Sequence, residues 1–475
     1  MKNLQASGTI AEKNIELNSV SFPETNRRAG YPVDTSVQLK TLLDEYSVNS
    51  NPIAVSFRKL VPWLKVGSRA THYLHPYPAK LFPQIAHFFL ASNELSPSGA
   101  VVLDPFSGSG TVALEAILSG RNAIYADVNP FAQLLTSAKT TLFDPKRLEI
   151  LLPEIKSNFL KSRTKKIPDV VNVDLWFSPK NLRALSRLKA AIDKSCPAEF
   201  KDFVEITFSS TCKKVSNADP RFNVPVRRKE KNIKTGKREL VDNSNVNAWE
   251  VFEKAFTRNL GRLRQFVEIY PGDMDVKFAG SDALSLLNVQ QGCPLQSDSV
   301  DLIITSPPYA GAQKYIRSSS LSLGWLGLAK SKDLKILESM SIGREHFPKV
   351  KAKEFIPTSI SSADIVLKKV FEKNPLRACI ASSFLLEMRI ALDEAYRVLK
   401  PGGHIVLVIG NNKICGHEFK SSEYLSKILL EAGAEVLLSL VDAIPSRTLT
   451  TSRADTASVI KNEHIVLFRK PKIKR

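Results

Sequence analysis

The chain has 475 residues, enough for two or three domains, and its 43% apolar and 24% charged residues are typical of a globular protein. Lys and Arg number 67 against 47 Asp and Glu, and the formal net charge of +20 favours a polyanionic partner over colloidal solubility alone. The five cysteines are dispersed, and no stretch approaches the ~20 apolar residues of a membrane span. With a polar N-terminus that shows no signal pattern, we expect a reduced, cytoplasmic protein without a metal site or membrane span.

The first hundred residues contain little regular patterning. Residues 1–60 are polar and punctuated by Gly, Pro, Asn and Ser, so we expect an N-terminal extension with one short helix. Prolines predict an irregular loop over 71–83, and an apolar stretch predicts a helix over 84–90.

From Ala100 onward, short apolar strands alternate with amphipathic helices in two separate blocks of sequence. The expected strands are 100–104, 122–127, 276–279, 302–305, 404–409, 436–441 and 464–468. The expected helices are 111–119, a helix after Pro130, 384–399 and 423–432. This alternation predicts an α/β protein whose mostly parallel sheet is covered by helices on both faces.

Between the two blocks, residues 141–270 are expected to be mostly helical. They include a basic, proline-bearing loop over 213–245, which is either a solvated loop or a nucleic-acid contact. Its cations are Arg221, Arg227, Arg228, Lys229, Lys231, Lys234, Lys237 and Arg238. A second, Lys-rich insertion spans 330–376.

Residues 104–111 read Asp-Pro-Phe-Ser-Gly-Ser-Gly-Thr and follow the strand at 100–104. A Gly-rich turn at the carboxyl end of a strand is where doubly wound sheets bind ligands, since glycine lets the backbone approach closely. The turn lacks the third glycine of the dinucleotide fingerprint, which argues against NAD. By itself, this stretch could also be a tight strand-to-helix connection.

Residues 305–309 read Thr-Ser-Pro-Pro-Tyr and follow the apolar run 300–304. Two prolines fix the backbone and remove competing N–H donors, leaving a hydroxyl, carbonyl oxygens and an aromatic ring. These groups suit a flat heterocycle held by its amino group. The alternative is a plain turn after a buried strand.

Together, the two segments resemble the DNA methyltransferases of the Thr-Ser-Pro-Pro-Tyr type, which methylate exocyclic amino groups with S-adenosylmethionine (SAM). The resemblance implies a doubly wound, Rossmann-like methyltransferase sheet of seven mostly parallel strands with a mainly helical insertion. The implied catalytic domain is discontinuous, over 61–140 and 271–475, and the insertion at 141–270 is expected to recognise DNA.

The resemblance also implies a set of cofactor residues. Asp104, Phe106, Gly108, Gly110 and Thr111 would form the SAM-binding turn, with Phe106 at the methionine end. Asp127 would accept the ribose hydroxyls, as in other doubly wound nucleotide sites, or else cap the next helix. Asp282 would meet the adenine amino group or form another cap. Lys80 would pair with the SAM carboxylate, or its loop is only structural.

In the expected chemistry, Ser306 and the Pro307 carbonyl accept the amino hydrogens and turn the nitrogen lone pair toward the methyl group. Pro307 and Pro308 stiffen the lip and Tyr309 stacks on the base, which must be flipped out of the duplex. Direct transfer depends on positioning and needs no cysteine nucleophile. We expect Arg221, Arg227, Arg228, Lys229 and Lys231 to contact DNA, mainly at phosphates.

Ser at the first position of this motif is associated with cytosine-N4 methylation, whereas Asp or Asn is associated with adenine-N6. We therefore expect a site-specific cytosine-N4 DNA methyltransferase, with a restriction endonuclease as a plausible partner. The alternatives are an adenine-N6 enzyme and, from a different class, a non-catalytic DNA-binding protein on a decayed methyltransferase fold. The recognition sequence cannot be read from the chain.

Overall fold

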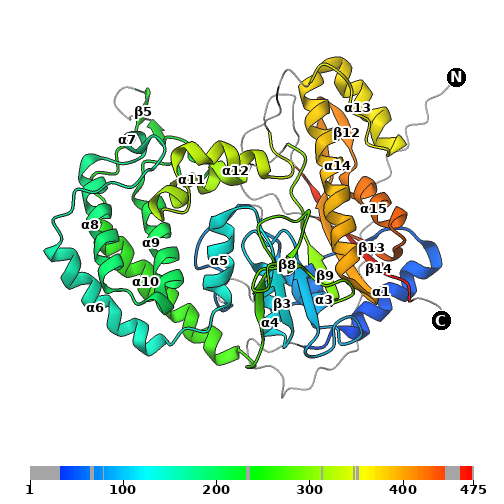
Figure 1. The fold of residues 1–475 in the computed structure, drawn as a ribbon, viewed down its shortest axis with the longest axis horizontal. Coiled ribbons are helices and arrows are strands. Elements are labelled where there is room, and N and C mark those ends of the chain that lie inside the picture. Colours follow the sequence, from blue (N-terminus) through cyan, green and yellow to red (C-terminus); the bar gives the residue numbers. More distant parts are fainter. Residues whose placement is uncertain are drawn as a thin grey trace.

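An eight-stranded sheet lies at the centre of the computed structural model, which describes residues 33–64, 69–78, 80–231, 236–311, 314–345, 348, 352–443 and 460–472 (Figure 1). The strand order is β1-β13-β14-β10-β9-β2-β3-β6. The strands are β1 Ile53–Val55, β2 Val101–Asp104, β3 Asn122–Tyr125, β6 Val276–Phe278, β9 Val300–Thr305, β10 Leu399–Gly410, β13 Glu435–Ala443 and β14 Asn462–Arg469. Among these strands, only β14 runs antiparallel to its neighbours. The mostly parallel α/β fold is confirmed.

The predicted number of seven strands is wrong by one, because β1 was assigned to the N-terminal extension. Residues 53–55 pair in parallel with β13 at the edge of the sheet. Helix α1 (Ser36–Asn49) precedes this strand and buries Leu39 and Leu42 in the core. Residues 33–60 therefore contribute to the central fold, and residues 1–32 of the expected extension lie outside the described part of the chain.

The central strands are continuous apolar runs because both faces of the sheet are buried. Successive side chains point to opposite faces, so Leu302 and Ile304 of β9 lie in one core cluster and Ile303 lies in the other. The first face is covered by α2 (Phe57–Leu60), α3 (Pro83–Leu90), α4 (Thr111–Leu118) and α5 (Pro130–Thr140). The second face is covered by α13 (Ser361–Lys373), α14 (Pro375–Val398) and α15 (Ser421–Glu431).

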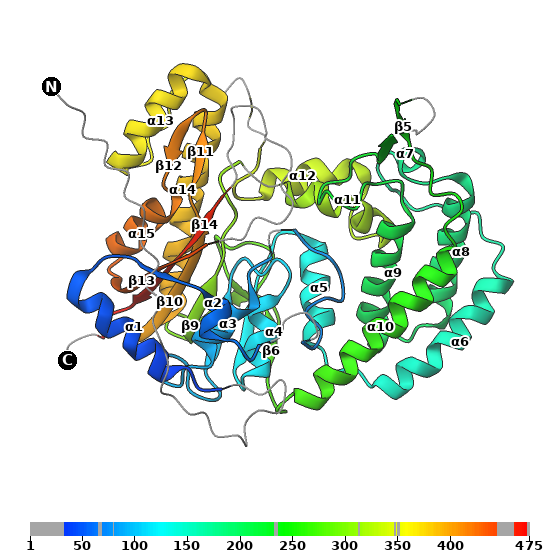
Figure 2. The ribbon, with the colours of Figure 1, turned by 180° about the vertical axis from the view of Figure 1, so that it is seen from behind.

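The insertion forms a helical bundle beside the sheet, as Figures 1 and 2 show from opposite sides. Its helices are α6 Pro145–Lys161, α7 Val173–Trp176, α8 Pro179–Ser195, the short 3₁₀ helix η3 Ala198–Phe200, α9 Lys201–Val215 and α10 Ala248–Ile269. Part of the predicted basic loop is instead a β-hairpin, formed by β4 (Lys229–Lys231) and β5 (Arg238–Leu240). Lys234 lies between them, outside the described residues.

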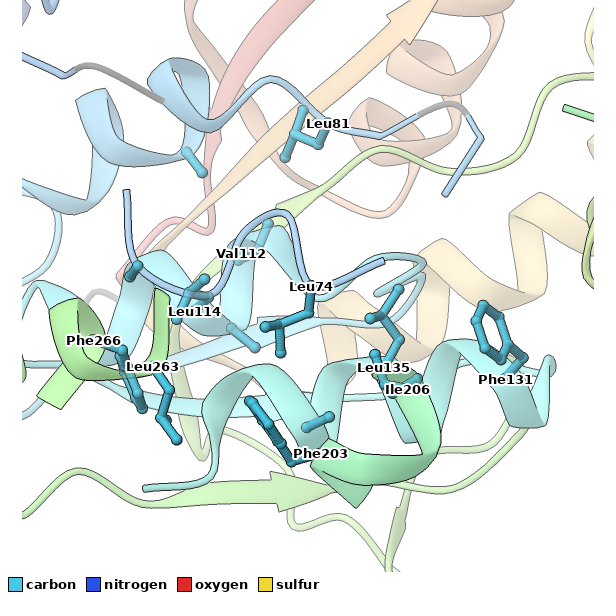
Figure 3. Close-up of a cluster of buried hydrophobic side chains, with 14 of the residues drawn as sticks. Leu74, Leu81, Val112, Leu114, Phe131, Leu135, Phe203, Ile206, Leu263 and Phe266 are labelled. Atoms are coloured by element: carbon cyan, nitrogen blue, oxygen red, sulfur yellow. The ribbon is translucent and has the colours of Figure 1, made fainter. Parts of the chain in front are cut away.

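The bundle shares one hydrophobic core with the first face of the sheet (Figure 3). Phe203 and Ile206 of α9 and Leu263 and Phe266 of α10 are fully buried in the same cluster as Leu135 of α5. The insertion and the helices that cover the sheet are therefore packed as one body.

The remaining elements lie near the carboxyl edge or on the periphery. Helix α11 (Tyr315–Trp325) packs on α9 and α5, and the 3₁₀ helix η4 (Ser331–Asp333) leads into α12 (Leu334–Met340). Two small hairpins are β7–β8 (Leu287–Asn288, Cys293–Pro294) and β11–β12 (Asn412–Ile414, His417–Phe419). Within the described ranges, the helices are too short or too polar to cross a lipid bilayer.

A buried ionic cluster joins α4 to the loop at residues 69–72 and to α3. The carboxylate of Glu115, fully buried on α4, is 2.8 Å from Arg69 Nε, 2.6 Å from His72 Nε2 and 3.1 Å from His87 Nδ1. Burial alone would raise the pKa of Glu115, but the charge of Arg69 and the histidine hydrogen bonds hold it well below its usual range. The loop that starts at Arg69 is thereby fixed against α4.

Replacing Glu115 with Gln should lower the free energy of unfolding by about 3–5 kcal/mol, because Arg69 would keep its buried charge without a counter-ion. Chemical denaturation of the purified variant measures the change. Glu149→Gln is the matched control, since its pair with Arg264 is more than half exposed and should contribute about 1 kcal/mol or less. An equal loss in both variants would contradict a special role for the buried cluster.

Candidate active site

The Gly-rich turn and the Ser-Pro-Pro-Tyr segment, here called the lip (residues 305–309), meet at one edge of the sheet. Their strands β2 and β9 are parallel neighbours, paired at Val102 with Leu302 and at Leu103 with Ile303. The hydroxyl of Thr305 donates a hydrogen bond of 2.8 Å to Asp104 Oδ1, which also accepts the Phe106 N–H at 3.1 Å. The last residues of the two strands are thus directly bonded.

A pocket with about 700 Å³ of empty space, open to solvent, lies between these two segments. Its lining comes from both motifs, from the turn after β3, from the turn after β6 and from the end of α12. The lining residues are Tyr77, Pro105, Phe106, Gly108, Asp127, Val128, Asn129, Ser281, Asp282, Ala283, Ser306, Pro308, Tyr315, Met340, Ser341 and Ile342.

The two glycines of the turn have different structural roles. Gly108 lines the pocket at φ +49°, and a Cβ there would lie 3.4 Å from the Tyr77 ring. Gly110 has φ +69° and packs on α5 so closely that a Cβ would lie 2.9 Å from Thr136 Cα. Gly110 therefore allows α4 and α5 to pack, and it does not line the pocket.

Asp127 is held at the pocket by two backbone groups. Its Oδ2 accepts the Gly108 N–H at 2.7 Å and its Oδ1 accepts the Asn129 N–H at 2.8 Å. Burial raises the pKa of Asp127 to about 6, and these hydrogen bonds oppose the shift. The alternative role as the cap of the next helix is wrong, because Asn129 accepts the Phe131 N–H and caps α5.

Asp282 follows β6, lines the pocket and is exposed. Its Oδ1 accepts the Leu284 N–H at 2.9 Å. The chain forms a turn here and no helix starts, so the predicted alternative of a helix cap does not apply.

Three of the predicted cofactor residues support the pocket without lining it. Asp104 is 4% exposed and links the two motifs, Gly110 packs on α5, and Thr111 is buried at the start of α4. Burial raises the pKa of Asp104 to about 7, although the hydrogen bonds from Thr305 and Phe106 counter the shift. The geometry therefore disfavours direct contact of a ligand with the Asp104 and Thr111 side chains or with Gly110.

Lys80 does not reach the pocket either. Its ammonium donates to the His72 carbonyl at 2.9 Å and lies 4.2 Å from the centre of the Tyr73 ring. Burial lowers the pKa of Lys80 to about 8. From the same loop, Tyr77 lines the pocket, and its hydroxyl accepts a long hydrogen bond of 3.4 Å from Asn129. Of this loop, Tyr77 and not Lys80 lines the pocket in this structure.

The lip presents Ser306 and Pro308 to the pocket, whereas Pro307 and Tyr309 are buried. Tyr309 is 8% exposed and lies in the core of the second face, and burial raises the pKa of its hydroxyl. The predicted stacking of this ring on a base is wrong for this conformation, because neighbouring side chains cover the ring. Tyr315, which follows the lip, lines the pocket instead.

The five predicted DNA-binding residues lie in or beside the insertion hairpin, away from the pocket lining. Arg221 forms an ion pair of 2.5 Å with Asp219, and Arg228 pairs with Glu230. Lys229 is exposed, and the side chain of Lys231 lies outside the described part of the structure. Nε and Nη1 of Arg227 are buried and make no hydrogen bond with the described atoms. Internal pairing thus reduces the free charge at two of the five positions.

The sequence assigned no site role to several residues that line the pocket: Tyr77, Asn129, Tyr315, Met340, Ser341 and Ile342. Tyr77 and Asn129 stand beside motifs that the sequence did single out. Met340, Ser341 and Ile342 come from the second insertion, and nothing local in that segment indicates a site.

This chain is similar to known proteins both in one segment and over most of its length. Residues 55–136 match the family model N6_N4_Mtase, described as DNA methylase. The type II methyltransferase M.MvaI of Kocuria varians is 25% identical over 84% of this chain and 91% of its own length. The type II methyltransferase M.BsoBI of Geobacillus stearothermophilus is 21% identical over 79% of this chain and 80% of its own. A solved structure, the putative DNA modification methylase TTHA0409 of Thermus thermophilus, is 17% identical over 41% of this chain and 54% of its own, at a TM-score of 0.20 that is too low to build on.

Asp104 should give the protein a specific pH dependence. Because its folded pKa of about 7 exceeds the unfolded value, the folded state binds the proton more tightly, and this contribution to stability is lost as the pH rises through about 7. Asp104→Asn keeps an oxygen acceptor for Thr305 and cannot ionise. We expect the melting temperature of the variant, relative to wild type, to increase between about pH 5 and about pH 8. A constant difference across this range would show that Asp104 stays ionised in the fold.

Proposed function

We propose that this chain methylates cytosine N4 in duplex DNA. The matched family model and the type II relatives support an amino-methylating DNA methyltransferase of the N4/N6 group. The observation that carries the proposal is that Ser306 of the lip lines the same pocket as Phe106, Gly108 and Asp127 of the cofactor side. A methyl donor and an amino acceptor can therefore share one pocket.

The pocket residues fit SAM. The ring of Phe106 and the backbone at Gly108 offer an apolar surface and a close approach for the methionine part. Asp127 has carboxylate lone pairs beyond the two that accept backbone N–H groups, and these suit the ribose hydroxyls. Asp282 is exposed where an adenine amino group would be received. SAM supplies a methyl group on a positively charged sulfur.

The lip residues supply the acceptor side of the reaction. Ser306 Oγ and the Pro307 carbonyl accept the hydrogens of the base amino group, which turns its lone pair out of the ring plane. The two prolines hold these acceptors in place, so little reorganisation is needed at the moment of transfer. The target base reaches the lip by leaving the duplex stack.

Ser306 is the reason to favour cytosine over adenine. In the Thr-Ser-Pro-Pro-Tyr type, Ser at this position is associated with cytosine N4, and Asp or Asn with adenine N6. Adenine N6 is the second candidate, because both bases present a flat ring with an exocyclic amino group. A non-catalytic, decayed fold is disfavoured because Phe106, Gly108 and Ser306 are all present at one pocket.

Duplex DNA is the proposed partner, and the insertion is the proposed recognition region. Besides Arg227 and Lys229, the insertion has three cations that lie near one another on α9 and α10: Lys214, Arg258 and Arg262. Burial and the charges of Arg258 and Arg262 lower the pKa of Lys214. Clustered cations suit a phosphate backbone, whose neutralisation makes binding salt-dependent. Because these relatives are named type II methyltransferases, we also propose a cognate restriction endonuclease as a partner.

The test is to methylate DNA with SAM, digest it to nucleosides and identify the modified base by mass spectrometry. We expect N4-methylcytosine from the wild type. Ser306→Ala should bind SAM normally by calorimetry but lose about 10²–10³ in turnover, because one acceptor at the reacting nitrogen is gone. N6-methyladenine would select the second candidate. No modified base in a folded protein that binds DNA would select the decayed fold.

Asp127 should make SAM binding pH-dependent. With a pKa raised to about 6 by burial, its carboxylate becomes protonated below that pH and loses acceptor capacity, so SAM affinity should fall as the pH drops through about 6. Asp127→Asn should weaken binding by about 1–3 kcal/mol at neutral pH and flatten this dependence. The matched control is Asp301→Asn, because Asp301 pairs with Lys400 away from the pocket lining. Calorimetry that finds unchanged affinity in a folded Asp127→Asn variant would restrict Asp127 to holding the turn.

A further inference from the structure

Residues 341–345, here called the strap, cross the lip directly after α12. Ser341 and Ile342 of the strap line the pocket, together with Met340 at the end of α12. The strap belongs to the second insertion, to which neither the sequence motifs nor the proposed chemistry gives a role. Helix α12, which precedes the strap in sequence, and helix α14, which contacts it through Glu387, are visible in both views (Figures 1 and 2).

The strap touches the lip backbone at Gly343. The Gly343 carbonyl accepts the Gly311 N–H at 3.2 Å. A Cβ at position 343 would lie 2.7 Å from Tyr309 O and 3.5 Å from Pro308 Cβ, and the residue has φ +75°. A side chain at this position would therefore push the strap and the lip apart.

Two ion pairs anchor the strap on either side of this contact. Arg344 forms a bidentate pair with Glu387 of α14, at 2.8 Å and 2.7 Å. Glu345 pairs at 2.8 Å with Lys314, which lies just beyond the lip. Arg344 also donates to the Ser341 carbonyl at 3.4 Å, which closes the strap on itself. The strap is thus fixed to α14 and to the chain that leaves the lip.

We propose that the strap is a positioning element of the methyl-transfer site, with Gly343 as its critical positioning residue. The inference depends on the proposed function, because it assigns a reason for the strap–lip contact in that reaction. The contact falls on Pro308 and Tyr309, two and three residues after Ser306, and the two prolines make this backbone stiff. A shift at Tyr309 is therefore transmitted to the acceptors that orient the amino group.

The first test compares Gly343→Ala with Gly327→Ala. Both glycines have left-handed backbones, at φ +75° and φ +68°, but a Cβ at 327 meets no atom within 4 Å. The two variants therefore share the backbone penalty and differ in the clash with the lip. We expect kcat for methyl transfer to DNA to fall about 10- to 100-fold in Gly343→Ala, as for other small misplacements of reacting groups, with SAM affinity and the KM for DNA unchanged. Gly327→Ala should keep the wild-type kcat.

A second measurement does not depend on activity. The Gly311 N–H bonded to Gly343 should be protected from hydrogen exchange in the wild type and in Gly327→Ala, and should exchange faster in Gly343→Ala. Mass spectrometry of peptides that cover the lip reports this. Equal kcat and equal exchange in the two variants would overturn the inference and leave the proposed function standing. A wild type that transfers no methyl group would refute the proposed function, while the exchange result would still decide whether the strap holds the lip.

A milder pair of variants covers the case in which Gly343→Ala fails to fold. Arg344→Lys removes the bidentate pair with Glu387 without creating a clash. Arg389→Lys is the control. Arg389 lies on α14, the helix that carries Glu387, and it pairs at 2.7 Å with Glu431, which does not line the pocket. A lower kcat and faster Gly311 exchange only in Arg344→Lys support the positioning role. The same values in both variants contradict it.

Discussion

The pairing of β2 with β9 is the constraint on which the site depends. Parallel neighbours end at the same edge of a sheet, so two segments that are distant in sequence must emerge side by side. The hydrogen bond from Thr305 to Asp104 then fixes the end of β9 against the end of β2. Placement of the pocket thus follows from the sheet, and loop residues only refine it. This agrees with the general location of ligand sites at the carboxyl edge of α/β sheets.

Most strands were predictable because burial on both faces leaves an unbroken apolar run, as in β9 and β10. The edge strand β1 was not, since three residues carry too little pattern and the pairing with β13 decides its structure. The hairpin β4–β5 was missed for a related reason. Its strands read Lys-Glu-Lys and Arg-Glu-Leu, a charged sequence that resembles a solvated loop.

Within the site, the sequence was informative where the backbone dictates the geometry. Ser306, Phe106, Gly108, Asp127 and Asp282 line the pocket as expected, because each stands at or just after the end of a strand. Long side chains were less predictable. The ammonium of Lys80 lies over Tyr73, and the ring of Tyr309 is buried, and both outcomes depend on tertiary neighbours. Ile342 reaches the pocket through a contact between distant segments, which no local pattern encodes.

The continuous core between the insertion and the sheet has a consequence for how such a protein could be modified. Phe203, Leu263 and Phe266 complete the covering of the helices next to the Gly-rich turn (Figure 3). Excising the bundle would expose that apolar surface to water, and grafting a foreign recognition region would require a matching set of side chains. The hairpin β4–β5 contributes none of its described residues to this core, so it can be changed without opening it. The proposed recognition region thus shares its core with the sheet, and its hairpin β4–β5 is the part that lies outside this core.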